Sequence, residues 1–264
     1  MNFQEFRGSA GARQRYWGRA LAGWRMFATV EPNAGHRALA RLEAAGHLDC
    51  VITQNVDGLH QRAGSRNVID LHGRVDAVEC LDCRERSPRA ALQAALERSN
   101  PGWMDQAGQI APDGDAVLEH ADFSHFEVPD CEACGGTLKP AVVFFGEPVP
   151  RPRVARAMAA VAGAEGLLVA GTSLMVYSGY RFVRAARAQG VPVAIVNLGC
   201  TRADHEADLR LVGPCGPLLD AAVQHSMDPK AARPDPMHRV GAGGENRSCS
   251  RLTREPGDSL TKSR

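Results

Sequence analysis

Three short apolar segments, each followed by a polar or glycine-containing turn, restrict the fold of this chain more than any other feature. The segments, each with its turn, are residues 48–52 with 53–58, 167–170 with 171–173, and 191–196 with 197–199. Each is too short for a typical helix and reads as a buried strand. Because helical patterns separate the strands, their order predicts an α/β fold with a parallel sheet. Right-handed crossovers keep such strands pointing one way, so the three turns should lie at one edge of the sheet, where ligands of α/β proteins bind.

Helical patterns occur between and before these strands. Asn33 is a suitable N-cap and Gly46 a suitable stop for a helix over residues 34–45. Residues 1–30 carry aromatic side chains at roughly helical spacing, which indicates a helical segment with a packed aromatic core. The other predicted helices are residues 89–98, 151–162 and 180–189.

Four of the eight cysteines form two C-x-x-C pairs, Cys80 with Cys83 and Cys131 with Cys134. Four thiolates suit tetrahedral zinc, and a site with four protein ligands has no open position, so one structural zinc ion is expected. The alternative, four unligated or redox-active cysteines, fits this spacing less well. Metal-binding cysteine pairs are typical of a reducing compartment, so we expect a cytoplasmic protein.

Bulk properties argue against several partners. The formal net charge of +1 gives no electrostatic reason to expect nucleic acid or an anionic membrane as the main partner. No apolar run is long enough to span a bilayer. Residues 226–264 are rich in Pro, Gly, Ser and Arg and nearly lack aliphatic residues, so they are predicted to form a disordered tail.

Several motifs, taken together and in order, resemble the sirtuins, the NAD-dependent protein deacylases. They are TQNVDGLH, AGS, LHG and the C-x-x-C pairs. The resemblance runs from about Phe3 to about Ala222. The segments QRYWGRALAGW, CLDCRERSPR, LKPAVVFFGE and GTSLMVYSGYRF look most like the class II branch that includes mitochondrial sirtuin 4.

The resemblance implies an NAD site at the predicted strand ends. It assigns the nicotinamide pocket to residues 55–57, the nearby ribose to Gln54, a phosphate or ribose contact to the glycine turn, and the adenosine ribose to the last turn. It also implies that Cys215 lies beside the adenine, although a small buried apolar role is equally compatible with the sequence. The implied NAD contacts are Gln54, Asn55, Val56, Asp57, Gly171, Thr172, Ser173, Asn197, Leu198, Gly199 and Cys215.

His72 is the candidate general base, because an imidazole titrates near neutral pH and can accept a proton there. By resemblance, the acyl-lysine amide oxygen attacks the nicotinamide ribose and nicotinamide leaves. His72 then deprotonates a ribose hydroxyl, and the acyl group ends on ADP-ribose. An acyl-lysine protein or peptide is implied as a strand added to Val142, Phe144, Gly146 and Glu147. Val142 and Phe144 are also compatible with a plain core role.

The expected organisation is a Rossmann-like lobe with a small zinc-binding insert. Residues 1–73 and 139–225 are assigned to the NAD-binding lobe, 74–138 to the insert, and 226–264 to the tail. Sirtuins begin with a strand and a GAGxS loop that cradles the NAD phosphates. This sequence begins downstream of them, so the first Rossmann strand is expected to be missing, through either a misplaced start codon or a truncated gene. If the protein begins at Met1, NAD affinity and stability are expected to be low.

The favoured function is therefore NAD-dependent protein lysine deacylation, an acyl-transfer reaction. The first alternative is a truncated, catalytically impaired relative that acts as a binding protein. A second alternative is mono-ADP-ribosyl transfer or lipoyl removal. The sequence does not determine the acyl-chain length, the protein targets or the oligomeric state.

Overall fold

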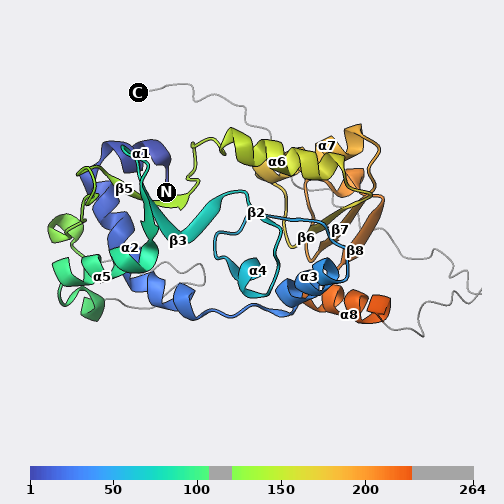
Figure 1. Cartoon of the computed structure of the whole chain (residues 1–264), viewed down its shortest axis with the longest axis horizontal. Coiled ribbons are helices and arrows are strands. Elements are labelled where there is room, and N and C mark those ends of the chain that lie inside the picture. The colour runs from blue at the N-terminus through green and yellow to red at the C-terminus, as the bar shows by residue number, and fades with distance from the viewer. Residues whose placement is uncertain (107–120, 228–264) are drawn as a thin grey trace, which may run out of the picture.

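The computed structural model describes residues 1–106 and 121–227. Figure 1 shows two lobes side by side, with α1, α2, α5 and β5 in one and α6, α7 and β6 to β8 in the other. The elements are α1 (Phe3–Gly8), α2 (Ala10–Thr29), α3 (Ala34–Ala44), β1 (Val51–Thr53), α4 (Leu59–Arg62), β2 (Val68–Asp70), β3 (Gly73–Cys80), β4 (Arg86–Pro88), α5 (Arg89–Ser99), the 3-10 helix η1 (Trp103–Gln106), η2 (Phe123–His125), β5 (Leu138–Val142), α6 (Arg151–Ala162), β6 (Leu167–Ala170), α7 (Tyr177–Ala188), β7 (Val193–Asn197), η3 (Asp204–Glu206), β8 (Leu209–Val212) and α8 (Cys215–Met227).

The large lobe contains the predicted parallel strands, in two separate pieces. One piece is β1 with β2, in the register Val51 to Val68, and the other has the order β6–β7–β8. Within the described residues, β1 pairs only with β2 and β6 pairs only with β7. The α/β fold with parallel pairing is confirmed. The expected absence of a first strand stays a prediction.

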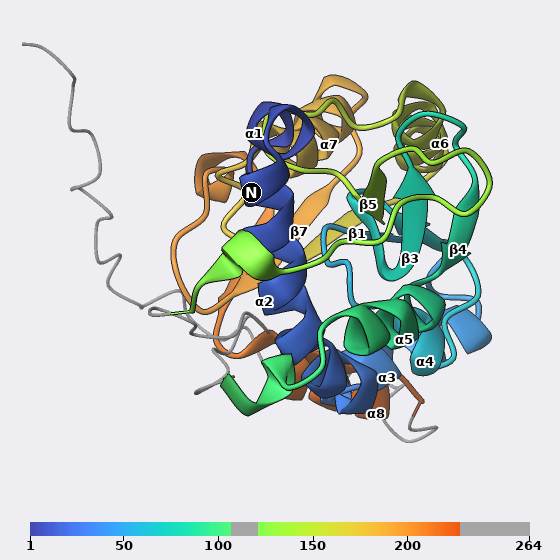
Figure 2. The same ribbon diagram turned by 90° about the vertical axis from the view of Figure 1, so that its left-hand side faces the viewer.

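Helices cover both faces of these strands. Figure 2 shows α6 and α7 on one side and α3 and α8 on the other. The larger core lies under α6 and α7, where Val161, Val183 and Ile195 are almost completely buried. A smaller cluster of Ala38, Leu219 and Val223 joins α3 to α8. The parallel strands therefore form the middle of three layers.

The small lobe is built on an antiparallel sheet of order β4–β3–β5. Its core contains Phe6 and Trp17 from the N-terminal helices together with Val78, Leu96 and Phe126. The N-terminal helices therefore pack with the cysteine-containing insert, and not with the parallel sheet as the predicted boundaries had them. The aromatic side chains of the first helices supply the core that the insert lacks by itself.

Element boundaries follow the local capping chemistry. Asn33 is the N-cap of α3, as predicted. Its side chain accepts from the His36 N–H and the His36 ring accepts from the Asn33 N–H, which forms a capping box that was not predicted. By contrast, α7 begins at Tyr177, three residues before the predicted start. The strand β2, β8 and the helix α8 were not predicted.

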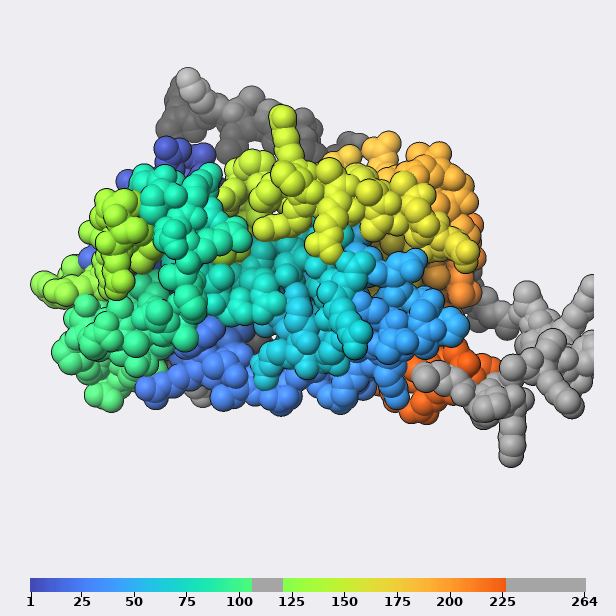
Figure 3. Space-filling model, in the orientation of Figure 1, coloured from blue at the N-terminus to red at the C-terminus, as the bar shows by residue number. Residues whose placement is uncertain are grey.

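The surface between the lobes is formed by the segment that leads from α4 into β3. On the face shown in Figure 3, this cyan segment lies beneath the yellow α6. Helix α8 continues to Met227 and so includes the first two residues of the predicted tail. Residues 228–264 and 107–120 lie outside the described residues. None of the described helices combines the length and apolarity needed to cross a membrane.

Candidate functional site

His72 lies between the two lobes, just after β2. Its Nδ1 is 3.1 Å from the Gln54 carbonyl oxygen, and its Nε2 is 2.8 Å from Ser178 Oγ. Its own carbonyl accepts a hydrogen bond from the Val143 N–H at 2.8 Å. The predicted base is therefore held by the end of β1, the first turn of α7 and the segment after β5.

Gly73 is required where the chain turns from His72 into β3. It has φ +83°, and a Cβ at this position would be 2.0 Å from the Ala141 carbonyl oxygen. No side chain fits there, because both the conformation and the contact exclude one. The glycine after the histidine therefore allows β5 to pass directly beside the imidazole.

The surroundings of His72 favour its neutral form. Partial burial lowers the pKa of the ring, the Gln54 carbonyl opposes this by favouring the protonated form, and Arg153 and Arg181 lower the pKa further. A carbonyl can only accept, so Nδ1 carries the hydrogen in the neutral ring. Nε2 therefore carries the lone pair, which is the arrangement a general base requires.

A side-chain hydrogen bond joins the turns that follow β1 and β6. Gln54 Nε2 donates to Thr172 Oγ1 at 3.0 Å. The Gly171 N–H donates to the Val196 carbonyl, which places the glycine turn beside the end of β7. A Cβ on Gly171, whose φ is +65°, would be 3.0 Å from Cys215 Sγ. The structure thus brings together the predicted turns after β1, β6 and β7, and Cys215 with them.

Other predicted NAD contacts lie at the same edge but have local partners. The Asp57 carboxylate accepts from the Leu59 N–H at 2.9 Å, in the turn that leads into α4. The Asn197 side chain donates to the Gly199 carbonyl at 3.0 Å. Of the remaining predicted NAD contacts, Val56 is half-buried and the others are exposed, namely Asn55, Ser173, Leu198 and Gly199.

The predicted substrate segment divides into core and surface residues. Phe144 is 8% exposed and belongs to the small-lobe core, whereas Phe145, which the sequence reasoning did not select, is 73% exposed. Glu147 accepts from the Phe144 N–H and pairs with the buried Lys139 at 3.0 Å. Gly146 is exposed. The surface open to a peptide here is therefore Phe145 and Gly146, while Phe144 and Glu147 hold the segment in place.

One edge of this segment is already paired. The Phe3 N–H donates to the Phe145 carbonyl at 2.9 Å, and the Phe145 N–H donates to the Met1 carbonyl at 3.3 Å. Asn2 thereby forms a parallel bridge with Phe145. Any added strand must use the opposite edge.

The four predicted metal ligands converge in the small lobe. Their sulfur atoms all lie within 4.8 Å of one another. Cys80 Sγ is 3.6 Å from Cys134 Sγ, and Cys83 Sγ is 3.7 Å from Cys131 Sγ. A tetrahedral zinc ion with Zn–S bonds of about 2.3 Å places its sulfurs about 3.8 Å apart. The donor set and its spacing therefore fit zinc.

The two cysteine hairpins have the same backbone shape. Arg84 and Gly135, each four residues after the first cysteine of its pair, have φ of +65° and +71°. The Asp82 carboxylate accepts from the Thr137 N–H at 3.0 Å and ties one hairpin to the other. The backbone conformation of the two hairpins thus directs all four sulfur atoms toward one point.

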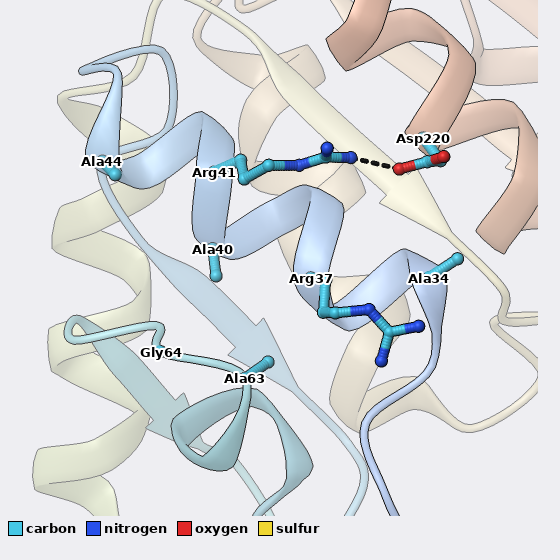
Figure 4. Close-up of a pocket in the computed structure, with 8 residues that line it drawn as sticks. All are labelled: Ala34, Arg37, Ala40, Arg41, Ala44, Ala63, Gly64 and Asp220. Atoms are coloured by element: carbon cyan, nitrogen blue, oxygen red, sulfur yellow. Dashed lines mark hydrogen bonds and ion pairs between the residues drawn. The ribbon is translucent and has the colours of Figure 1, made fainter.

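A shallow groove of about 470 Å³ lies away from His72, between α3, the end of α4 and α8. Figure 4 shows that small side chains such as Ala40 and Ala63 line it. Arg41 pairs across it with Asp220. Because Arg41 and Asp220 pair with each other and Arg37 donates to the Pro32 carbonyl, the groove contributes nothing to the site around His72.

The fold and the site define the class of protein: a ligand-binding α/β protein that carries a second, cysteine-stabilised lobe. The family model described as "Sir2 family" matches residues 3–178. A Xanthomonas campestris pv. campestris protein (strain 8004) named NAD-dependent protein deacetylase is 53% identical over 242 residues, which cover 92% of this chain and 80% of the relative. The chain therefore belongs to the Sir2 family.

Further comparisons agree. A Bordetella bronchiseptica protein, also named NAD-dependent protein deacetylase, is 54% identical over 223 residues, covering 84% of this chain and 81% of the relative. The solved structure "Sir2-p53 peptide-NAD+" has a TM-score of 0.68 and 29% identity, covering 85% of this chain and 81% of its own. A Sir2 homolog–NAD complex has a TM-score of 0.65 and 32% identity, covering 85% and 75%.

Proposed function

We propose that this protein is an NAD-dependent protein lysine deacetylase that transfers the acyl group to ADP-ribose and releases nicotinamide. The observation that carries the proposal is the imidazole of His72, neutral and held with Nε2 as its lone-pair nitrogen, beside the converging strand ends. Relatives named NAD-dependent protein deacetylase support the same activity. In chemical class the reaction is an acyl transfer.

The residues at the strand ends fit a dinucleotide. Gly171 lets the end of β6 lie close to Cys215, and Ser173 and Gly199 are exposed at the same edge. When bound, NAD supplies an activated glycosidic carbon. We assign Gln54 and residues 55–57 to the nicotinamide end, residues 171–173 to the central phosphates and ribose, and residues 197–199 with Cys215 to the adenosine end.

His72 acts as the general base in this proposal. Nδ1–H stays on the Gln54 carbonyl while Nε2 removes a proton from a ribose hydroxyl. The neighbouring Arg153 and Arg181 disfavour the protonated ring, so the base is available at neutral pH. The acyl-lysine segment would lie beside Gly146, along the edge opposite the Asn2–Phe145 bridge, where it is recognised mainly through its backbone.

The four cysteines would hold one zinc ion with a structural role. The ion would fix the two hairpins to each other and thereby support the lobe that carries the peptide-binding segment. Metal-binding cysteine pairs also support a reducing compartment, and we propose the cytoplasm.

The test is His72→Ala, with the exposed His47→Ala as a matched control. General-base removal should lower deacetylation of an acetyl-lysine peptide by about 10²-fold to 10⁴-fold. Zinc content and thermal unfolding should match the unchanged protein. Deacetylation by His72→Ala at the rate of His47→Ala would refute the role of the imidazole.

The divided parallel sheet favours one second candidate function, a binding protein with impaired turnover. In the described chain no strand joins β1 to β6, beside the proposed NAD site. Nicotinamide release distinguishes the two functions. An enzyme releases nicotinamide from NAD when an acetyl-lysine peptide is added, whereas a binding protein retains the peptide without release.

A further inference from the structure

Ser178 is a buried serine in direct contact with the candidate base. It lies in the first turn of α7, is 9% exposed, and places its Oγ 2.8 Å from His72 Nε2. The adjacent Gly179 approaches Gln54 so closely that a Cβ there would be 2.8 Å from the Gln54 amide nitrogen. The first turn of α7 therefore packs against both His72 and Gln54, the residue whose carbonyl holds the His72 ring.

We propose that Ser178 is a positioning residue for His72, which holds the imidazole against the Gln54 carbonyl in both of its protonation states. This inference rests on the proposed function for its kinetic consequence. Its structural content, the orientation and tautomer of the ring, does not depend on it.

A hydroxyl suits this role because it can both donate and accept. While the His72 ring is neutral, the Ser178 hydroxyl donates to the lone pair of Nε2. Nε2 has a single lone pair, so a ribose hydroxyl must displace the Ser178 hydroxyl from it before giving up its proton. Once the ribose oxygen has moved away, the Ser178 oxygen accepts the new N–H. The proton lost by the substrate is then on Nε2, and Nδ1–H remains on the Gln54 carbonyl throughout.

The other groups around the ring cannot replace this contact. The Gln54 carbonyl, from the end of β1, occupies Nδ1. Arg153 on α6 and Arg181 on α7 are cations that oppose protonation of the ring. Loss of the Ser178 hydroxyl therefore removes the contact that stabilises the protonated ring at Nε2, and hydrogen bonds to a charged group are stronger than those to a neutral one.

The experiment compares Ser178→Ala, Ser178→Thr and the control Ser226→Ala. Ser226 is an exposed helical serine whose hydroxyl donates to the Ala222 carbonyl at 2.8 Å. Deacetylation of an acetyl-lysine peptide with NAD is measured from about pH 5 to about pH 9, across the range in which histidine titrates. Exchange of labelled nicotinamide into NAD is measured in parallel.

Ser178→Ala should lower deacetylation at least about tenfold, as expected for a displaced base. It should also move the acid limb of the pH profile to lower pH, and Ser178→Thr should restore both. Nicotinamide exchange should change less than deacetylation, because the base acts after nicotinamide leaves. Unchanged rate and pH profile in Ser178→Ala would overturn the proposal.

A second measurement tests the contact between Ser178 and His72 without relying on deacetylase activity. Nitrogen-15 NMR of the histidine rings reports the tautomer and pKa of His72 directly. The unaltered chain should show hydrogen on Nδ1, and Ser178→Ala should lower the pKa of His72. A His72 signal that is identical in Ser178→Ala and Ser226→Ala would exclude the contact. If the wild type shows this signal but no deacetylation, the proposed function fails and the positioning contact stands.

Discussion

Gly73 determines where the imidazole of His72 can lie. Its positive φ turns the chain sharply after the histidine, and the missing side chain lets the Ala141 carbonyl approach. The same crossing allows the Val143 N–H to bond the His72 carbonyl. The backbone of the base is thus fixed by β5, while its ring is fixed by Gln54 and Ser178.

Gly73→Ala should destabilise the protein by about 3–5 kcal/mol, because it combines a left-handed backbone with a severe contact. Gly190→Ala is the matched control. Gly190 also has positive φ, +73°, but nothing lies within 4 Å of its missing Cβ, so its cost should be about 1–2 kcal/mol. Urea unfolding of both variants measures the difference. Equal costs would show that the contact with Ala141 can be relieved.

Only some of the functional residues could be predicted from the sequence. His72 and the four cysteines stand in local motifs, so their chemistry could be predicted. Ser178 could not, because its partner is 106 positions away and only the folded α7 brings them together. Phe145 was missed because β5 ends at Val142, after which the alternation of buried and exposed residues no longer holds.

At the scale of elements, the two cysteine hairpins lie at the ends of two paired strands of the small lobe. One follows β3 and the other precedes β5, and these strands pair with each other. Helices α2 and α5 cover that sheet, and Arg89 lies over the rings of Trp17 and Trp24 at 5.2 and 5.0 Å. The small lobe was predicted as an insert, but its dependence on the N-terminal helices was not, since helix periodicity does not reveal which sheet a helix covers.

Loss of the metal should therefore disturb this lobe first. All three tryptophans, Trp17, Trp24 and Trp103, belong to its helices α2 and η1, so tryptophan fluorescence reports on it selectively. Cys80→Ser should bind less zinc and unfold at a lower temperature by fluorescence, because metal affinity contributes to folding.

Cys50→Ser is the control for that experiment, because Cys50 is a free, half-buried cysteine of the large lobe. It should keep one zinc ion per chain. A zinc-free Cys80→Ser protein with unchanged fluorescence and unfolding temperature would contradict a structural role for the metal.

At the scale of the whole molecule, three half-buried histidines couple stability to pH. The rings of His36 and His60 contact each other at a tilt of 58°, with centroids 4.7 Å apart. Burial lowers the pKa of both rings. The positive charge of a protonated His36 lowers the pKa of His60 further. His72 is lowered by burial as well. All three are therefore neutral in the folded protein at neutral pH.

Stability should fall as the pH drops below about 6.5, the ordinary histidine value. Below that pH the unfolded chain takes up protons before the folded one does, so the free energy of unfolding decreases, whereas above it the stabilisation is complete. His36→Gln keeps an acceptor for the capping box but does not titrate. Urea unfolding should show a smaller acid loss in this variant, and an equal loss would exclude His36 as a contributor.

The division of the parallel sheet has a mechanical consequence. In the part of the chain that the structure describes, no backbone hydrogen bond joins β1 to β6, and the Gln54–Thr172 side-chain bond spans the boundary instead. The two pieces can shift against each other without breaking a ladder. A dinucleotide bound across both strand ends would act as a cross-link, so its binding should raise the unfolding temperature and slow hydrogen exchange in β1 and β6 together.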